Sequence, residues 1–322
     1  MIGAKRLRAG RWSGDGRENR IDRRILDAAG ITDPVLRQAY TRCRHLHARH
    51  GRTYYLATLL LPPWKRPYVH ALYGFARFAD EIVDTEPVAT RSTHFSSWSQ
   101  QALDSLTDGS GYVDDVTIAL RDTMQRWDIP IEHITAFLES MAADLTVTGY
   151  ETFEDLNRYI YGSAAVIGLQ MIPILGPLVD EAYPRARALG EAFQLTNFIR
   201  DIAEDFARGR IYLPASDLRQ FDVTPADLAQ TKTSHAVREL LRYEIDRTRK
   251  LYAYAVGGIP MLQPSSRPCV DAAYTLYSGI LEAIEDAEYE VLDRRVCVGL
   301  PTRLRIAAPA YARARRIREP AP

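Results

Sequence analysis

The chain has 322 residues, of which 46% are hydrophobic and 25% are charged, and its 41 Lys and Arg side chains balance 41 Asp and Glu side chains. This composition is typical of a soluble globular protein and excludes a disordered chain or a collagen-like repeat. The zero net charge argues against a dedicated nucleic-acid-binding protein, because contacts to phosphates usually require a surplus of basic residues.

Apolar residues recur at spacings of three and four along most of the chain, which predicts helices, and strand-like alternation is scarce. The predicted helices, in chain order, are Pro34–His50, Arg66–Asp84, Ser96–Leu106, Asp114–Trp127, Ile131–Leu145, Phe153–Ile172, Glu181–Ala207, Ser234–Val256 and Cys269–Leu292. The breaks between them are short and rich in Gly and Pro, so none is a domain linker. We therefore predict an all-α fold with one domain over residues 25–300.

Both ends of the chain are basic. Residues 1–24 hold eight basic and three acidic side chains, and residues 301–322 hold six and one. The N-terminal segment lacks the apolar stretch of a secretory signal, and we expect a flexible arm and a flexible tail. Basic residues near an anionic membrane contribute about 1 kcal/mol each, so the ends are the expected contact with a membrane.

Three widely spaced cysteines, Cys43, Cys269 and Cys297, form no CxxC pair and suit a reducing cytosol. We therefore expect a cytoplasmic protein that is peripheral at the inner membrane surface. Tyr159–Val179 is a stretch of 21 residues without a charge, long enough in principle to span a bilayer. Internal Pro and Gly residues interrupt it, so we interpret it instead as a buried helix that lines an apolar pocket.

An acidic motif lies in the second predicted helix. Tyr73, Arg77, Asp80 and Asp84 follow one another at spacings of four, three and four, so their side chains share one helix face. The flanking residues are largely apolar, and the segment is therefore not expected to be fully exposed. Like charges at this spacing repel unless a positive group lies between them.

A second motif repeats the pattern, because Gln194, Asn197, Asp201 and Asp205 also share one helix face. Such carboxylates suit Mg²⁺, which prefers oxygen ligands and leaves positions for water and phosphate. Zinc is disfavoured because no His or Cys accompanies either motif. Two facing motifs of this kind predict a clamped diphosphate leaving group, and the resulting carbocation requires a dry pocket with aromatic rings.

At these motifs the sequence resembles the squalene/phytoene synthases, and within that family the bacterial phytoene synthases. The most specific matches are YGFARFADEIVD (Tyr73–Asp84) and QLTNFIRDIAEDFARGRIYLP (Gln194–Pro214), with support from residues 50–62, 153–168 and 277–296. The resemblance runs from about residue 33 to residue 298. It implies an isoprenoid-synthase-type helical bundle, in which residues 25–300 form the catalytic domain around a central apolar cavity.

The resemblance also implies roles for individual residues. The residues expected to bind Mg²⁺ are Asp80, Glu81, Asp84, Asn197, Asp201 and Asp205, where Glu81 replaces an Asp that the family often has. The residues expected at the diphosphates are His50, Arg52, Tyr54, Arg77, Arg200 and Arg294. The residues expected at the reaction centre are Tyr73, Arg77, Tyr159, Gln194 and Tyr277. A structural alternative exists for several: Arg77 can simply neutralise its neighbours, the tyrosines can be core residues, and His50 can be a surface residue.

The implied reaction joins two geranylgeranyl diphosphates head to head, through prephytoene diphosphate, to give phytoene and two diphosphates, the first step of carotenoid biosynthesis. Mg²⁺ is the expected cofactor, with Mn²⁺ as a substitute and no NADPH. The expected partners are the two prenyl diphosphates and a downstream carotenoid enzyme, and nucleic acid is not among them.

Three alternatives remain open at this point. Within the family, the chain can instead convert farnesyl diphosphate to squalene or dehydrosqualene. Squalene formation needs a hydride from a dinucleotide cofactor. The chain has no GxGxxG loop between a strand and a helix, so a built-in dinucleotide-binding domain is not expected. A terpene cyclase or a head-to-tail prenyltransferase would share the paired acidic helices. A non-catalytic helical lipid-binding or scaffold protein would be expected to lose acidic positions, and neither motif has lost one.

Overall fold

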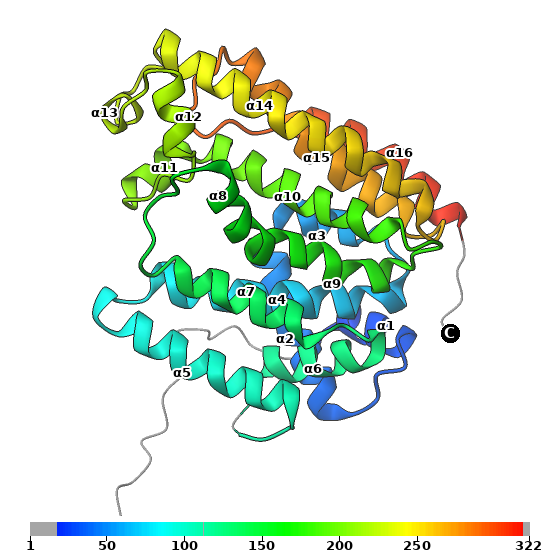
Figure 1. The fold of residues 1–322 in the computed structure, drawn as a ribbon. Coiled ribbons are helices and arrows are strands. Elements are labelled where there is room, and N and C mark those ends of the chain that lie inside the picture. The colour runs from blue at the N-terminus through cyan, green and yellow to red at the C-terminus, as the bar shows by residue number, and fades with distance from the viewer. Residues whose placement is uncertain (1–17, 112, 318–322) are drawn as a thin grey trace, which may run out of the picture.

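A computed structural model describes residues 18–111 and 113–317, without the side chains of Arg52, Ala307 and residues 300–304. This part of the chain is a bundle of helices without a β-sheet (Figure 1). The α-helices are α1 (Arg20–Ala28), α2 (Pro34–His50), α3 (Arg52–Thr58), α4 (Arg66–Thr85), α5 (Val88–Thr107), α6 (Asp115–Trp127), α7 (Ile131–Ala143), α8 (Phe153–Ile160), α9 (Val166–Leu175), α10 (Ala182–Arg200), α11 (Ile202–Ala207), α12 (Ala215–Gln220), α13 (Pro225–Leu228), α14 (His235–Ala255), α15 (Arg267–Asp286) and α16 (Leu300–Arg316). The predicted all-α class is confirmed.

Helix α10 lies in the middle of the bundle, with α9 on one side and α14 on the other (Figure 1). Its residues Ala192, Thr196 and Ile199 are fully or almost fully buried. Helix α4 occupies the centre of the other half, where it packs on α2 and α6. The first acidic motif therefore lies on one central helix, α4, and the second begins on the other, α10, and continues through Asp201 into α11.

Local sequence accounts well for α2. Its residue bounds are those that the periodicity predicts, because the Asp33 side chain accepts hydrogen bonds from the backbone N–H groups of Val35 and Leu36. Pro34 at the first helical position needs no such acceptor, since it has no N–H group. Helix α2 ends at His50, and the single residue Gly51 separates it from α3.

Two of the longest predicted helices are interrupted. Within the predicted helix Phe153–Ile172, residues Tyr161–Ala165 form a turn of π-helix between α8 and α9. A Cβ atom at Gly162 would lie 2.1 Å from Ser140 Oγ and 2.2 Å from the Ala136 carbonyl oxygen, so this turn packs directly on α7. The predicted helix Glu181–Ala207 ends at Arg200, because Asp201 (φ −102°, ψ 14°) leaves the helical conformation before α11 begins.

Of the two basic ends, residues 20–24 lie in α1 and residues 301–316 lie in α16. Residues 1–17 and 318–322 lie outside the described residues, so the flexibility of the ends stays a prediction. Asp22 explains the order of α1, because its fully buried carboxylate pairs with the buried guanidinium of Arg44 in α2. The same carboxylate accepts a hydrogen bond from the backbone N–H of Asn19, at 2.9 Å. Charge counts along the sequence do not predict such an ion pair, because they contain no information on which side chains are buried.

The uncharged stretch of the sequence forms the end of α8, the π-helical turn and α9, and Ile160, Val166 and Ile174 in it are completely buried. Among the described residues, no helix combines the length and the apolar character needed to cross a membrane. The three cysteines form no disulfide bond.

The buried Asp22–Arg44 pair leads to a prediction about stability. Asp22→Asn leaves the buried Arg44 without a counter-charge and with neutral partners such as the Tyr55 hydroxyl, so we expect the free energy of unfolding to fall by about 3 kcal/mol. Chemical denaturation followed by circular dichroism measures this change. Asp27→Asn is the matched control, because Asp27 forms an exposed ion pair with Arg37, and its loss is expected to stay below about 1 kcal/mol. Equal effects of both substitutions would contradict the role of Asp22.

Candidate active site

The first acidic motif occupies the last two turns of α4. Ala79, Ile82 and Val83 are buried against the bundle, so Asp80, Glu81 and Asp84 are displayed on the remaining faces. Arg77 lies between two of the carboxylates. Its Nη1 donates to Asp80 Oδ2 at 2.5 Å and its Nη2 donates to Glu81 Oε2 at 2.7 Å. Arg77 thus supplies the positive charge that this cluster of like charges requires.

The second motif is arranged around the corner at Asp201. Arg200 donates two hydrogen bonds to the Asp201 carboxylate, at 2.7 and 2.5 Å, and Arg295 Nη2 donates a third at 3.0 Å. Arg295 also pairs with Glu204 at 3.4 Å. One turn upstream, the Asn197 Oδ1 atom is buried and has no hydrogen-bond partner in the described part of the chain. A buried amide oxygen in that state is available to a cation.

Arg210 connects the two motifs. Its Nη1 donates to Asp84 Oδ1 at 3.2 Å and its Nη2 donates to the Asp144 carbonyl oxygen at 2.9 Å. Its charge also lowers the pKa of Asp205, although burial and Asp201 outweigh that effect. Arg208 adds a longer contact of 3.4 Å to Asp84. The carboxylates of α4 and α11 therefore face a shared group of arginines.

Two of the acidic side chains are electrostatically unfavourable as carboxylates. Burial, reinforced by the charge of Asp84, raises the pKa of Asp80 to about 6. Burial, reinforced by Asp201, raises the pKa of Asp205 to about 7. A bound divalent cation would relieve both, because opposite charge favours the ionised form.

The donor set fits Mg²⁺. It consists of carboxylate oxygens and the unpartnered Asn197 amide oxygen, which are hard ligands, and it contains no thiolate or imidazole. Within residues 18–111 and 113–317, no three His, Cys, Asp or Glu side chains are grouped as a metal-binding cluster. The arrangement therefore lacks an all-protein metal cage, and Mg²⁺ commonly takes only one or two carboxylates together with water and substrate phosphates.

Aromatic side chains lie beside the second motif. Tyr54 of α3 stacks on Tyr277 of α15, with ring centroids 4.8 Å apart, and Phe193 of α10 lies 4.5 Å from Tyr277. The hydroxyl of Tyr277 interacts with Tyr54 and with Arg200, and burial raises its pKa. Arg200 thus links the carboxylate of Asp201 to an apolar aromatic wall.

Tyr73 is held near the first motif by a histidine pair that the motifs alone do not reveal. The His47 ring stacks on the Tyr73 ring, with the ring centroids 4.0 Å apart. The Nδ1 atom of His47 lies 2.9 Å from Nδ1 of His70. Burial lowers the pKa of both histidines, so the pair is neutral and one ring donates to the other. A Cβ atom at Gly51 would lie 2.5 Å from His47 and 2.8 Å from Tyr73, which explains the glycine.

Tyr159 belongs to a network centred on Asp144. The Tyr159 hydroxyl donates to Asp144 Oδ2 at 2.8 Å and the Tyr212 hydroxyl donates to Oδ1 at 3.1 Å. The ring of Tyr212 stacks on Phe198 at 4.1 Å. Because Arg210 is bound to the carbonyl oxygen of the same Asp144, this network joins the aromatic residues to Asp84.

The remaining predicted residues are placed as follows. His50 lies close to Arg77 and Glu81, which both influence its pKa, and burial lowers that pKa. Gln194 is close to Asn197, whose Nδ2 is 3.5 Å from Gln194 Oε1. The side chain of Arg52 lies outside the described residues. Arg294 is exposed, and its neighbour Arg295 contacts the motif instead, because the chain after α15 is irregular and does not follow helical spacing.

Sequence reasoning missed several residues of the site, namely Asp144, His47, Arg210, Tyr212 and Arg295. Two of them, Arg210 and Tyr212, lie inside the family-specific motif Gln194–Pro214, so their position in that motif could have identified them as candidates. Asp144 carries no comparable signal, since it follows a helix with no neighbouring acidic residue at helical spacing.

The raised pKa of Asp205 predicts a cost in stability. The folded protein holds this proton more tightly than the unfolded chain, so stability falls as the pH rises from about 4 to about 7. Asp205→Asn should therefore raise the free energy of unfolding by about 1 to 3 kcal/mol near pH 8 in chelator-containing buffer, and should have little effect near pH 4. Thermal melts over this pH range test it.

Asp201→Asn is the matched control for Asp205→Asn, because Asp201 is held by Arg200 and Arg295. It should lower stability near pH 8. A gain for Asp201→Asn, or none for Asp205→Asn, would contradict the electrostatic assignment.

Comparison with known proteins agrees with this geometry. Residues 47–302 match the family model described as squalene/phytoene synthase. The chain is 37% identical to the phytoene synthase of Arthrospira platensis over 292 residues, which are 86% of this chain and 94% of that protein. It is 36% identical to the 15-cis-phytoene synthase of Synechocystis sp. over 289 residues, which are 86% of each chain.

A solved structure shares the fold. It is the crystal structure of a dehydrosqualene synthase with a ligand, which matches at a TM-score of 0.79 and 24% identity and covers 88% of this chain and 98% of that one. The expected isoprenoid-synthase-type helical fold is confirmed. With its two acidic motifs at the C-terminal ends of the central helices α4 and α10 and its match over residues 47–302, the chain belongs to the squalene/phytoene synthase family.

Proposed function

We propose that this protein is a phytoene synthase, an enzyme that transfers one prenyl group to another and joins two geranylgeranyl diphosphates head to head. The observation that carries the proposal is the meeting of two acidic motifs at Arg210, whose partner Asp144 also binds Tyr159. Tyr54 and Tyr277 form an aromatic pair at Arg200 of the second motif. The relatives from Arthrospira platensis and Synechocystis sp. bear the names of that activity and match along most of their length.

The proposed cofactor is Mg²⁺, with Mn²⁺ as a substitute. Its ligands would come from Asp80, Glu81, Asp84, Asn197, Asp201 and Asp205. Four of these carboxylates, those of Asp80, Glu81, Asp84 and Asp201, are paired with arginines in the structure. When bound, the metal neutralises negative charge on the diphosphate and makes it a better leaving group. The raised pKa values of Asp80 and Asp205 support this assignment, since they mark carboxylates that lack sufficient positive charge.

The arginines of the site have a second proposed role, which is to bind diphosphate directly. Arg77 and Arg200 each hold carboxylates through guanidinium N–H groups that can equally donate to phosphate oxygens. Arg295, which contacts Asp201, is proposed to bind diphosphate in addition to Arg294, which the family resemblance indicated. A negative charge that develops on the departing diphosphate would then meet N–H donors that are already oriented.

The aromatic residues suit the carbocation stage of the reaction. The ring faces of Tyr54, Tyr277 and Phe193 carry partial negative charge, and they stabilise a cation without reacting with it. Tyr277 and Tyr159 are almost completely buried, and burial raises the pKa of both hydroxyls, so neither is ionised near neutral pH. Neutral phenols in a dry site are poor nucleophiles, which protects the intermediate.

The alternative product arises from farnesyl diphosphate, as squalene or dehydrosqualene. The names of the sequence relatives favour geranylgeranyl diphosphate, while the dehydrosqualene synthase with known structure supports the fold alone. For release of an apolar product, we propose peripheral contact between the basic ends of the enzyme and a membrane surface.

The test of function is incubation of the purified protein and MgCl₂ with geranylgeranyl diphosphate in the absence of NADPH. Phytoene, identified by chromatography and mass spectrometry, is the expected product. Farnesyl diphosphate is supplied in a parallel reaction, and squalene or dehydrosqualene from it alone would favour the alternative. Asp201→Ala is expected to abolish turnover while the protein stays folded. Absence of product from both substrates with the folded wild-type protein would refute the proposed activity.

Asp144 offers a finer test of the site. Asp144→Asn replaces one carboxylate oxygen with an NH2 group, so either the Tyr159 or the Tyr212 hydroxyl faces a donor where it now has an acceptor, and the two buried hydrogen bonds can no longer both form as they do now. We expect kcat to fall about 10- to 100-fold, which corresponds to the cost of an unsatisfied buried polar group. Tyr212→Phe is the matched control, because it preserves the bond from Tyr159 and should retain most of the activity. Wild-type turnover in Asp144→Asn would remove Asp144 from the catalytic network.

A further inference from the structure

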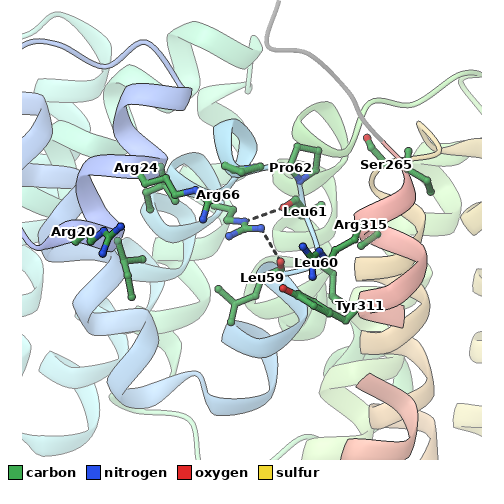
Figure 2. Close-up of a pocket in the computed structure, with 15 residues that line it drawn as sticks. Arg20, Arg24, Leu59, Leu60, Leu61, Pro62, Arg66, Ser265, Tyr311 and Arg315 are labelled. Carbon is green, nitrogen blue, oxygen red and sulfur yellow. Dashed lines mark hydrogen bonds between the residues drawn. The ribbon is translucent and has the colours of Figure 1, made fainter. Parts of the chain in front are cut away.

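A groove lies at the end of the molecule away from the acidic motifs. It is a cavity of about 1020 Å³ between α1, the turn at residues 59–63, the start of α4 and the last turns of α16 (Figure 2). Helix α4 extends from this groove to the first acidic motif, because Arg66 at the groove is 14 residues before Asp80 and 18 residues before Asp84. At 1.5 Å per residue, the two are about 21 to 27 Å apart along the helix axis.

The groove is strongly basic. Arg20 and Arg24 of α1, Arg66 of α4 and Arg315 of α16 line it, and no Asp or Glu is among its lining residues (Figure 2). The N-terminal and C-terminal basic segments, which are almost 300 residues apart in sequence, thus contribute to one surface feature. Three of these arginines are exposed, and Arg66 is half-buried.

Nearby carboxylates are engaged elsewhere. Glu18 and Asp27 pair with Arg37, and Asp22 pairs with Arg44 in the core. On α16, Arg313 pairs with Asp271 and so does not contribute free charge. The acidic residues closest in sequence to Arg20 and Arg24 therefore offset other arginines, and the groove keeps a positive charge to which an anion is complementary.

The groove also has an apolar part. Ile25, Leu60 and Leu61 lie in its buried wall. At the rim, Ile21 is 56% exposed and Tyr311 is 51% exposed. Arg66 is fixed between the two regions, because it donates hydrogen bonds of 2.8 Å to the carbonyl oxygens of Leu59 and Leu61 (Figure 2). A ligand that fits this surface combines an anionic group with a hydrocarbon chain.

We propose that this groove receives the phosphate headgroup and the adjoining acyl chain of an anionic phospholipid, and that the enzyme docks on a bilayer through this face. The docking rests on the proposed function only for its purpose, since phytoene is a hydrocarbon that water cannot carry. A bilayer is favoured over a soluble anion because exposed apolar side chains stand beside the arginines, as in proteins that bind at the membrane interface.

The test is co-flotation of the full chain with phosphatidylcholine vesicles that contain or lack phosphatidylglycerol. We expect binding only to the anionic vesicles. The combined variant Arg20→Gln, Arg24→Gln, Arg315→Gln should bind on the order of 100-fold more weakly, from about 1 kcal/mol per basic residue. The matched control carries the same charge change in Arg219→Gln, Arg242→Gln and Arg249→Gln, which are ion-paired arginines outside the groove, and should bind almost as the wild type does.

A second variant, Ile21→Gln with Tyr311→Gln, removes the exposed apolar groups and should weaken binding that persists at high salt. Turnover of all variants in detergent micelles should equal that of the wild type, which separates a loss of docking from a failure of the proposed activity. Vesicle binding is measured independently of catalysis.

Three outcomes would overturn the proposal. The first is equal vesicle binding by the wild type and the groove variants, and the second is equal weakening by the control variant. The third is groove-dependent binding of monomeric dihexanoylphosphatidylglycerol or inorganic pyrophosphate by a wild-type protein that does not bind vesicles, because this would identify a site for a soluble anion.

Discussion

Repulsion between carboxylates in a largely apolar environment is the constraint on which the rest of the site depends. Asp80 and Asp84 on α4 and Asp201 and Asp205 beyond α10 gather at one end of two central helices, where burial raises the pKa values of Asp80 and Asp205. Arginines offset this cost only in part. The negative charge of these carboxylates is thus only partly neutralised by the protein. Additional positive charge, such as a bound metal ion, would stabilise them.

The irregular parts of the helices serve the same end. Asp201 keeps the backbone hydrogen bond from its N–H to the Asn197 carbonyl oxygen, at 2.8 Å, and Arg200 and Arg295 bind its carboxylate at the point where α10 ends. The π-helical turn begins two residues after Tyr159, whose hydroxyl donates a hydrogen bond to Asp144. Turns of π-helix often occur at functional sites, because they change the direction of neighbouring side chains at a modest cost in hydrogen bonding.

The acidic motifs and the basic groove lie at opposite ends of the molecule. In Figure 1, α11, which carries Asp205, lies on the left, whereas α1 lies on the right, where α16 ends. The acidic site and the basic groove are thus joined by α4 and separated by its length. Under the two proposals, the diphosphates bind at one end of α4, and the basic groove at the other end binds a bilayer that can accept the apolar product.

The sequence by itself determined the all-α class, the bounds of α2, the two acidic motifs and the family, because these depend on spacing along the chain. It did not reveal that Arg210 meets Asp84, a contact across 126 residues, or that Asp144 joins Tyr159 to Tyr212. It also did not predict that the two basic ends come together, although α1 and α16 line one groove in the structure. Helical periodicity reports which face of its own helix a residue occupies, and only tertiary packing decides which distant residue meets that face.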